Sequence, residues 1–368
     1  MKENNPIYLP GLNGIRAIAA MSVVVSHINN RLNLYSLEKG TLMSVADYAV
    51  TVFFTLSGFL ITYLLLQEKS KTGDIDIKKF YIRRILRIWP LYFLYLLLTV
   101  IIIGFEEIKW PILLYVFMIP NFTNSIGQYF STSISKISGA GGLVGHYWSL
   151  GVEEQFYAFW PWIVKNGRHL LKILILFPIF YILLKIILNI TNAPYAILVF
   201  VNYTRFGCMF IGALGAYLYY YHNEIVMKWV NMKIMQIIAI IFFALVIFNL
   251  FHIASPVNHE IASVFTLIII INQISNPRKL FSLENKPLNF LGKISYGLYV
   301  WNPLIIYILS LTYKEYFADI QINKLFLMLL IYVLNTAMII LISYLSYEFF
   351  EKRFLKFKTK FMIIKSRS

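Results

Sequence analysis

The sequence predicts an all-α, polytopic membrane protein with about ten transmembrane helices. Hydrophobic residues make up 59% of the 368-residue chain and charged residues only 14%, far from the composition of an average soluble domain. Apolar segments close to the ~20 residues that a helix needs to cross a bilayer recur along the whole chain. The net charge of +16 is attributed to topology and to anionic lipid headgroups, and a nucleic acid partner is not predicted.

Ten apolar segments define the predicted spans. They are residues 12–29, 45–67, 88–104, 149–164, 170–190, 198–221, 233–252, 260–275, 292–311 and 323–348. A shorter apolar run is bounded by Pro111 and Pro120. It is too short to cross a bilayer, so we predict a re-entrant or interfacial segment at residues 111–122.

The distribution of Lys and Arg predicts the orientation, because cytoplasmic loops carry the excess of positive charge. With the N-terminus in the cytoplasm, 25 of the 33 Lys and Arg residues fall in inner segments and five in outer ones. The even number of spans places the C-terminus in the cytoplasm as well. We therefore predict a membrane-embedded domain over residues 1–350 and a basic cytoplasmic tail over residues 351–368.

Other segments are less informative. The first span is predicted to stay in the mature protein, because it shows no clear cleavage site. The lone Cys208 permits no internal disulfide. The outer stretch 105–147 contains a Ser- and Gly-rich run at 138–142, which is predicted to be a lid, an acceptor-binding loop or a plain connector.

Polar residues inside the predicted spans indicate a site. Arg16 and His27 are eleven residues apart, about three helical turns, so both project from nearly the same face. Glu153 lies five residues into a span that enters from outside, at a depth similar to that of His27. Because a carboxylate orients an imidazole and raises its basicity, we predict that Glu153 pairs with His27. Glu154 points about 100° away, so the two glutamates are not expected to act together.

Structural interpretations compete with these assignments. His27 alone is also explained as a buried histidine bonded to a neighbour, and Arg16 as a snorkelling side chain. Ser57 with Gly58 is predicted to serve close helix packing, and Ser149 to cap its helix. His146 is predicted to be interfacial. The remaining histidines show no metal-ligand spacing, and no metal site is predicted.

A second cluster of polar residues lies at the inner entrance to the third span. Arg83 and Arg87 are four residues apart on one helical face, with Arg84 beside them. Positive-inside anchoring explains such a cluster, yet guanidinium groups also bind phosphates through paired hydrogen bonds. Together with Arg16, these arginines are the candidates for binding a phosphate-rich donor.

Four motifs occur in a recognisable order over nearly the whole chain. They are residues 12–20 followed by His27, residues 53–61 leading to 80–92, residues 148–157, and residues 294–301 with Tyr347, Glu348 and Glu351. In this order they resemble the acyltransferase-3 family of integral membrane O-acyltransferases, which typically O-acetylate cell-surface glycans. Two positions depart from the family pattern. Asn13 stands where Asp is common, and Asn302 stands where many members have His.

The resemblance implies a transferase that modifies polysaccharide by O-acetylation in a bacterial-type plasma (inner) membrane. Its co-substrate is acetyl-CoA or another acyl-CoA in the cytosol, with no bound cofactor, and its acceptor is a hydroxyl of a cell-surface or lipid-linked saccharide. Arg83, Arg84 and Arg87 then hold the CoA phosphates while Arg16 positions the donor. His27 is the general base and Glu153 orients it. Supporting positions are Ser57, Trp148, Ser149, Gln155, Tyr157 and Asn302.

Several alternatives remain open. The acyl group either passes directly to the acceptor or rests transiently on His27 in a ping-pong reaction. The departure at Asn302 indicates that a histidine there is not required for proton transfer, or that this member has a different acceptor or weaker activity. A transporter or flippase for a glycan or lipid intermediate, and an inactive scaffold in a glycan-assembly complex, are the rival functions. An extracellular hydrolase-like domain is not expected.

Overall fold

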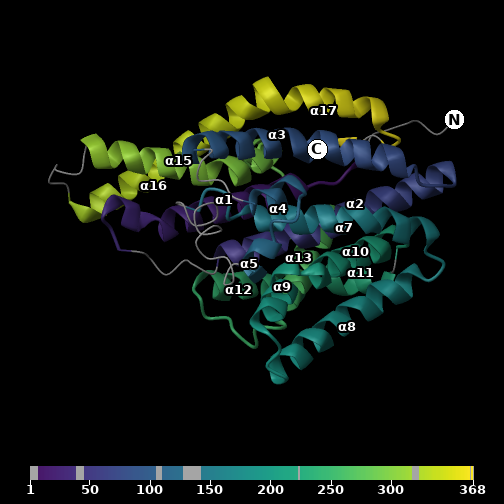
Figure 1. Cartoon of the computed structure of the whole chain (residues 1–368). Helices are drawn as coiled ribbons and strands as arrows, with labels where there is room; N and C mark the ends of the chain where they lie inside the picture. Colours follow the sequence, from purple (N-terminus) through teal and green to yellow (C-terminus); the bar gives the residue numbers. More distant parts are fainter. Residues whose placement is uncertain are drawn as a thin grey trace.

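The computed structural model describes residues 7–38, 45–104, 110–126, 142–222, 224–316, 323–364 and 366–367, which are almost entirely helical (Figure 1). The long helices are α1 (Leu12–Asn30), α2 (Val45–Thr72), α3 (Ile77–Ile103), α7 (Tyr147–Asn166), α8 (Leu170–Ile190), α9 (Tyr195–Thr204), α10 (Phe206–Tyr220), α12 (Lys233–Ile247), α13 (Asn258–Ser275), α15 (Ser295–Tyr316) and α16 (Lys324–Ser346). Shorter ones are η1 (Leu32–Tyr35), α4 (Ile112–Val116), α5 (Phe122–Ile126), α11 (Glu224–Val230), α14 (Lys286–Lys293), η5 (Tyr347–Glu351), α17 (Lys352–Lys358) and η6 (Thr359–Phe361).

The predicted all-α membrane architecture is confirmed, and each predicted apolar segment coincides with helix. Among the described residues, five helices are long and apolar enough to cross a membrane, and the number rises to seven if the bent pairs α11–α12 and α14–α15 are single spans. The predicted spans outside this set are α1, α7 and α13, which contain Arg16, Glu153 and Glu260. A charged residue in each of these three helices lowers its mean hydropathy, although α8 passes the same test with Lys185 in its apolar stretch.

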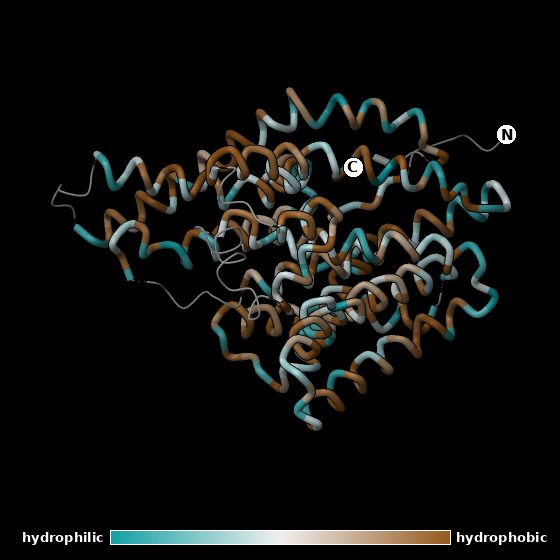
Figure 2. Tube along the Cα trace, viewed as in Figure 1, coloured by the Kyte–Doolittle hydropathy of each residue, from teal (hydrophilic) through white to brown (hydrophobic). Residues whose placement is uncertain are grey.

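Hydrophobic residues predominate along α8 and α16, whose traces are largely brown in Figure 2, and many of their side chains are exposed. Leu176, Phe180 and Ile190 on α8 are each more than half exposed, as is Val333 on α16. Such an apolar exterior is costly in water and favourable against lipid. The hydrophilic stretches, in contrast, concentrate where helices end and connect.

Helices α2 and α10 approach each other through glycine. A Cβ on Gly58 would lie 2.0 Å from the carbonyl oxygen of Met209, and one on Gly212 would lie 2.0 Å from that of Thr55. Small residues permit this close backbone contact. The packing role predicted for the Ser57–Gly58 pair is therefore confirmed for Gly58, while Ser57 makes a different contact described below.

The short run at residues 111–122 contains α4 and the start of α5. Tyr92 on α3 donates a hydrogen bond to the carbonyl of Tyr115 at 2.8 Å. A Cβ on Gly151 of α7 would lie 2.5 Å from the Pro120 ring. The segment thus packs against α3 and α7. The lid, acceptor-loop or connector interpretation of the stretch 105–147 falls in part outside the described residues, since 105–109 and 127–141 are not among them.

The two ends of the described chain lie side by side. Strands β1 (Ile7–Tyr8) and β2 (Ser366–Arg367) pair in parallel over two residues each. Helix α16 continues through η5, α17 and η6 as one 38-residue element, and α17 packs along α3 (Figure 1). Much of the predicted basic tail is therefore packed against the helical domain.

Candidate active site

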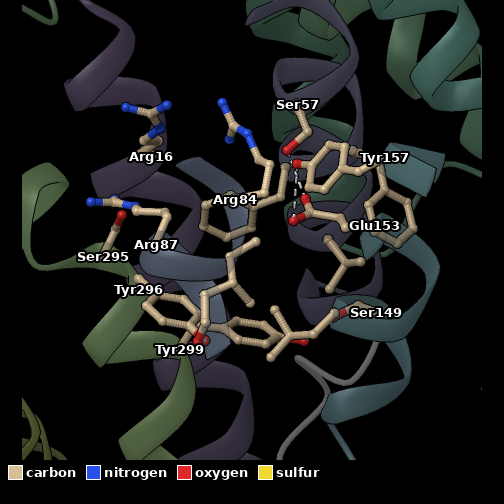
Figure 3. A pocket seen from close by; sticks show the side chains of 15 residues that line it. Arg16, Ser57, Arg84, Arg87, Ser149, Glu153, Tyr157, Ser295, Tyr296 and Tyr299 are labelled. Atoms are coloured by element: carbon tan, nitrogen blue, oxygen red, sulfur yellow. Dashed lines mark hydrogen bonds between the residues drawn. The ribbon is translucent and has the colours of Figure 1, made fainter. Parts of the chain in front are cut away.

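A cavity of about 130 Å³ lies between α1, α2, α3, α7 and α15, and we call it the central cavity (Figure 3). Each of these helices contributes polar side chains to an otherwise apolar interior. These are Arg16 from α1, Ser57 from α2, Arg84 and Arg87 from α3, Ser149, Glu153 and Tyr157 from α7, and Ser295, Tyr296 and Tyr299 from α15. The tertiary structure thus gathers polar groups from all four sequence motifs around one space, and three of the motifs contribute charge.

A larger cavity of about 290 Å³ adjoins the first, and we call it the cationic chamber. Five residues line both spaces: Arg16, Ser57, Arg84, Arg87 and Tyr157. Lys293 and Lys358 add two further cations to the chamber wall, and no carboxylate is among the residues that line it. Residues near both chain ends, from Ile7 and Tyr8 to Met362, complete the wall. The chamber is therefore suited to an anionic ligand.

Glu153 is held by hydroxyl groups inside the central cavity. The Ser57 hydroxyl donates to Glu153 Oε1 at 2.7 Å, and the Tyr157 hydroxyl donates to Oε2 at 3.4 Å (Figure 3). Glu154 instead faces α3, where the Trp89 indole donates to its Oε2 at 3.4 Å. The prediction that the two glutamates point apart is confirmed.

The three arginines of the central cavity leave much of their hydrogen-bonding capacity unused. The Arg84 guanidinium lies 5.4 Å from the centre of the Tyr157 ring and 5.8 Å from that of Phe80, a cation–π arrangement. Arg87 has no hydrogen-bond acceptor within the described parts of the chain. Arg16 Nη1 donates a long, 3.4 Å bond to Asn13 Oδ1, so a neutral amide makes the local contact at the position where Asp is common.

Arg83 is separated from Arg84 and Arg87, which revises its predicted place in the donor site. Its Nη2 forms a 2.9 Å ion pair with Glu68, and its Nη1 donates to the Phe361 carbonyl at 3.0 Å. Arg83 lines neither the central cavity nor the cationic chamber. The physical reason is Glu68, a 2% exposed carboxylate that requires a cationic partner. The i, i+3 pair Arg84 and Arg87 faces the cavities instead.

The predicted contact between Glu153 and His27 is wrong. His27 Nδ1 lies 2.6 Å from Asn302 Oδ1 on α15, while Glu153 is bound by Ser57 and Tyr157. At the level of His27, the chain leading into α7 presents His146, whose ring centre is 6.4 Å from that of His27. Similar depth in a membrane therefore did not mean contact, because α15 rather than Glu153 occupies the space beside the imidazole.

His146 is buried inside the protein, while its predicted interfacial role concerns depth in the membrane and stays a prediction. Its ring is 6% exposed and packs against the rings of Tyr95, Tyr147 and Tyr299 at 5.7, 4.9 and 5.3 Å between centres. The predicted cap function of Ser149 is wrong. Helix α7 begins at Tyr147, and the Ser149 hydroxyl donates back to the His146 carbonyl at 3.2 Å.

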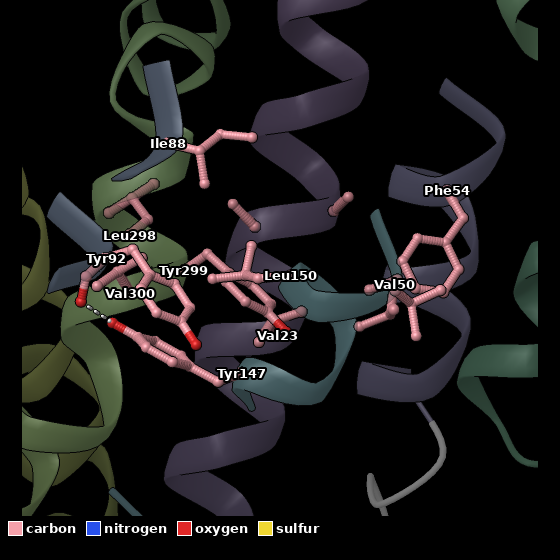
Figure 4. Packing of buried hydrophobic residues seen from close by; sticks show 14 of the residues in the cluster. Val23, Val50, Phe54, Ile88, Tyr92, Tyr147, Leu150, Leu298, Tyr299 and Val300 are labelled. Atoms are coloured by element: carbon pink, nitrogen blue, oxygen red, sulfur yellow. Dashed lines mark hydrogen bonds between the residues drawn. The ribbon is translucent and has the colours of Figure 1, made fainter. Parts of the chain in front are cut away.

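His27 lies outside the lining of the central cavity, although its partner Asn302 follows the lining residue Tyr299 by one helical turn. The hydroxyls of Ser149 and Tyr299 lie 2.6 Å apart at one end of the cavity. Figure 4 shows the apolar packing of Val23, Tyr147, Leu150 and Tyr299 in this region. His27 and Asn302 do not line the cavity.

Two of the predicted supporting residues, Gln155 and Trp148, connect α7 to neighbouring segments outside the central cavity. Gln155 forms reciprocal amide bonds with Asn121 at 2.6 and 3.3 Å. Trp148 packs edge-on against Tyr203, and the guanidinium of Arg205 lies 5.1 Å from the centre of its ring. Neither Gln155 nor Trp148 lines the central cavity.

The structure also places residues in the site that sequence reasoning did not single out. Tyr299 and Ser295 line the central cavity, and Lys293 and Lys358 line the cationic chamber. The i, i+4, i+7 spacing of Ser295, Tyr299 and Asn302 was a usable signal for one helix face. Lys358 had no such signal, because its position depends on the packing of α17 against α3.

Comparison with known proteins identifies the family. A family profile described as an acyltransferase domain (Acyl_transf_3) matches residues 9–348, which include all the helices that line the central cavity. The chain belongs to the acyltransferase-3 family. The structure therefore describes how an acyltransferase-3 domain arranges its four motifs around a central cavity.

Curated relatives agree with this membership. The chain is 28% identical over 377 residues to the O-acetyltransferase OatA of Staphylococcus aureus strain NCTC 8325 / PS 47, and 29% identical over 375 residues to a putative O-acetyltransferase of strain COL. Each alignment covers 95% of this chain and 58% of the relative. No solved structure matches the chain significantly.

Proposed function

We propose that this acyltransferase-3 protein transfers an acyl group, acetyl in the first instance, from cytosolic acyl-CoA to a hydroxyl of a cell-surface or lipid-linked saccharide. The observation that carries the proposal is the cationic chamber opening onto the central cavity. Five cations and no carboxylate line the chamber, and guanidinium and ammonium groups are the usual ligands of phosphates. The relatives named as O-acetyltransferases support the choice of acyl group.

The proposed topology has ten spans with both termini in the cytoplasm. The pairing of β1 with β2 supports an even number of crossings, because it holds both ends on one side of the molecule. The excess of Lys and Arg in the inner segments supports a cytoplasmic location for that side. Because residues near both ends line the cationic chamber, the chamber then faces the cytosol, where acyl-CoA is found.

The donor site is assigned to the cations that face the chamber. Arg84 and Arg87 bind CoA phosphates, with Lys293 and Lys358 at the chamber wall and Arg16 where the chamber meets the central cavity. Arg83 is left out of this set because Glu68 and the Phe361 carbonyl already occupy its guanidinium. Glu153 offsets part of the positive charge around Arg16 and Arg84 and holds the Ser57 and Tyr157 hydroxyls.

His27 is assigned as the general base. It removes the proton from the acceptor hydroxyl while that oxygen attacks the thioester carbonyl carbon. The tetrahedral intermediate then collapses, the carbon–sulfur bond breaks, and the proton passes from the imidazolium to the leaving thiolate. In the ping-pong alternative, the imidazole attacks the thioester carbon and the carbon–sulfur bond breaks, which releases the CoA thiolate. The hydroxyl then attacks the acyl-imidazole, its proton passes to the thiolate, and the neutral imidazole is restored.

The position of His27 adds a requirement to this mechanism. His27 does not line the central cavity, whereas the hydrogen-bonded Ser149 and Tyr299 do. The acyl group must reach His27 from this cavity. Either the Ser149 and Tyr299 hydroxyls move apart when both substrates are bound, or the acyl group passes between them. The acceptor then approaches His27 from the side opposite to the cationic chamber.

A transporter or flippase is the second candidate function. The observation that favours it is the break between α9 and α10 at Arg205, whose φ of 43° is left-handed, since broken helices are typical of transporter binding sites. Acyl transfer by the purified protein from labelled acetyl-CoA to a saccharide would distinguish the enzyme from a transporter.

The test measures the amount of acyl ester on surface glycan. The acyl group is released by alkali and quantified by mass spectrometry. Cells lacking the chain are complemented with the native form, with His27→Ala, or with His169→Ala, a matched variant of an exposed histidine at the start of α8. Loss of a general base typically costs ~10²–10⁴-fold in rate. Native and His169→Ala cells should therefore carry ester, and His27→Ala cells should carry almost none at equal membrane levels. Full rescue by His27→Ala would refute the role of His27, and equal ester without the chain would refute the acceptor class.

A further inference from the structure

We infer that Asn302 is a positioning residue that fixes the tautomer of His27, so that Nε2 is the atom that accepts the proton. This inference rests on the proposed function and deepens it. It assigns a role to the position at which the chain departs from the family pattern. The buried Asn302 amide makes hydrogen bonds that determine this role.

The orientation of the Asn302 amide is determined by its surroundings. Asn302 is fully buried, and its Nδ2 group donates to the carbonyls of Leu298 at 2.9 Å and Tyr299 at 2.7 Å. Backbone carbonyls only accept hydrogen bonds. The opposite orientation of the amide would place its oxygen against two other oxygens. Asn302 Oδ1 must therefore be the atom that faces His27.

The amide oxygen in turn determines the protonation of the imidazole. Oδ1 has no proton to give, and it lies 2.6 Å from His27 Nδ1. This short contact is favourable only if Nδ1 carries a hydrogen and donates it. In neutral imidazole the lone pair then resides on Nε2, on the far side of the ring. The structure thus assigns Nδ1 to positioning and Nε2 to proton transfer.

Charged or titratable groups on three segments surround His27. The groups that act on His27 are Arg31 one turn along its own helix, Asp47 on α2, and His146 before α7. Arg31 is fixed there by 2.8 Å bonds to the carbonyls of Pro303 and Gly142. Helix α15 presents Asn302, which is uncharged. An amide therefore orients the ring without the strong stabilisation of imidazolium that a carboxylate gives.

A histidine at position 302 would not specify the same state. An imidazole either donates or accepts, so a pair of histidines has two self-consistent tautomer arrangements. The amide, fixed by two backbone carbonyls, permits one. Asn302 thus removes an ambiguity, and the absence of the common histidine does not by itself imply lost activity.

The experiment uses the purified full-length protein labelled with ¹⁵N-histidine, with Asn302→Ala, Asn302→Asp and Asn335→Ala as variants. Asn335 is the matched control: it is buried, donates to the carbonyl of Ile331 at 2.8 Å, and bonds Tyr35 rather than a histidine. The imidazole nitrogen shifts report the tautomer of His27, assigned from the signals missing in His27→Gln. Steady-state transfer from acetyl-CoA gives the pH–rate profile.

The native protein and Asn335→Ala should show His27 protonated at Nδ1, and Asn302→Ala should show a mixture of tautomers. We expect kcat of Asn302→Ala to fall about 10- to 100-fold with little change in KM, less than the ~10²–10⁴-fold for loss of the base itself. Asn302→Asp should keep the Nδ1–H tautomer. It should also move the acidic limb of the pH–rate profile to higher pH, because a carboxylate favours imidazolium.

A native tautomer in Asn302→Ala would overturn the inference. Equal losses of kcat in Asn302→Ala and Asn335→Ala, with unshifted pH profiles, would also overturn it, because they indicate a structural effect alone. The tautomer measurement does not depend on turnover. If the tautomer responds to Asn302 while no acyl transfer occurs, the positioning role stands and the proposed function fails.

Discussion

Two clusters of charged residues lie within the helical bundle, and they are built differently. The first surrounds the central cavity and contains Arg16, Arg84, Arg87 and Glu153. The second joins α8 to α13 through a 2.6 Å ion pair between Lys185 and Glu260, each with a 3% exposed side chain. Neither Lys185 nor Glu260 lines the central cavity or the cationic chamber.

The difference lies in charge balance and space. In the Lys185–Glu260 pair, one cation meets one carboxylate at 2.6 Å, so the two charges balance each other. Around the central cavity, three guanidinium groups face one carboxylate beside open space. Burial of an unbalanced charge is costly unless something else neutralises it. Unpaired charge next to a cavity, rather than buried charge as such, therefore indicates a ligand site.

The largest expected effect concerns the Lys185–Glu260 ion pair. Lys185→Met should destabilise the protein by about 3–5 kcal/mol, because it leaves Glu260 buried without its cation. The double variant Lys185→Met/Glu260→Met should recover most of that loss. Thermal unfolding of purified protein in detergent measures both. If Lys185→Met were as stable as the native protein, the ion pair with Glu260 would not contribute to stability.

The next largest effect concerns the charged residues around the central cavity. Arg87→Ala should raise the KM for acyl-CoA about 10- to 100-fold, since a hydrogen bond to a charged group contributes ~1.5–3 kcal/mol. Its stability should change little, because Arg87 has no hydrogen-bond acceptor within the described residues. Arg83→Ala is the matched control, since it breaks the ion pair with Glu68. Arg83→Ala should lower stability while leaving the KM for acyl-CoA unchanged. If instead Arg83→Ala raised KM and Arg87→Ala lowered stability, Arg83 would be the donor-binding residue and Arg87 the structural one.

The smallest effect concerns a charge outside both clusters. Asp76 caps α3 by accepting from the Lys79 backbone N–H at 2.9 Å, and this bond lowers the pKa of the Asp76 carboxyl. Because the folded pKa is below the unfolded value of ~3.9, the contribution is complete above that pH and is lost as pH falls through the folded value. Asp76→Ala should cost about 1 kcal/mol at pH 7.

The control for this prediction is Asp76→Asn, which keeps a capping oxygen and should cost less than the alanine variant. The stability difference between native protein and Asp76→Ala should shrink on acidification below about pH 4. A difference independent of pH would mean that the carboxylate charge contributes nothing to the cap.

The predicted helices were largely readable from hydropathy, because each apolar segment must satisfy its backbone hydrogen bonds within itself. Arg16 and Glu153 were also readable as candidate site residues, since charge is rare in such segments, and Arg84 and Arg87 as a cationic cluster just before the third segment. The contacts of Arg83, His27 and Ser149 were not readable. Each depends on which neighbouring helix presents an acceptor, and no local pattern in the sequence encodes that choice.

By itself, the sequence determined the all-α membrane class, the apolar segments and the family, because these follow from composition, segment length and ordered motifs. Only the tertiary structure decided that Glu68 binds Arg83, that Asn302 rather than Glu153 contacts His27, and that α17 contributes Lys358 to the cationic chamber. Hydropathy constrains the depth of a residue in the membrane. The partner of a side chain depends on the rotation and packing of whole helices, which are set by contacts between residues as far apart as 27 and 302 in the chain.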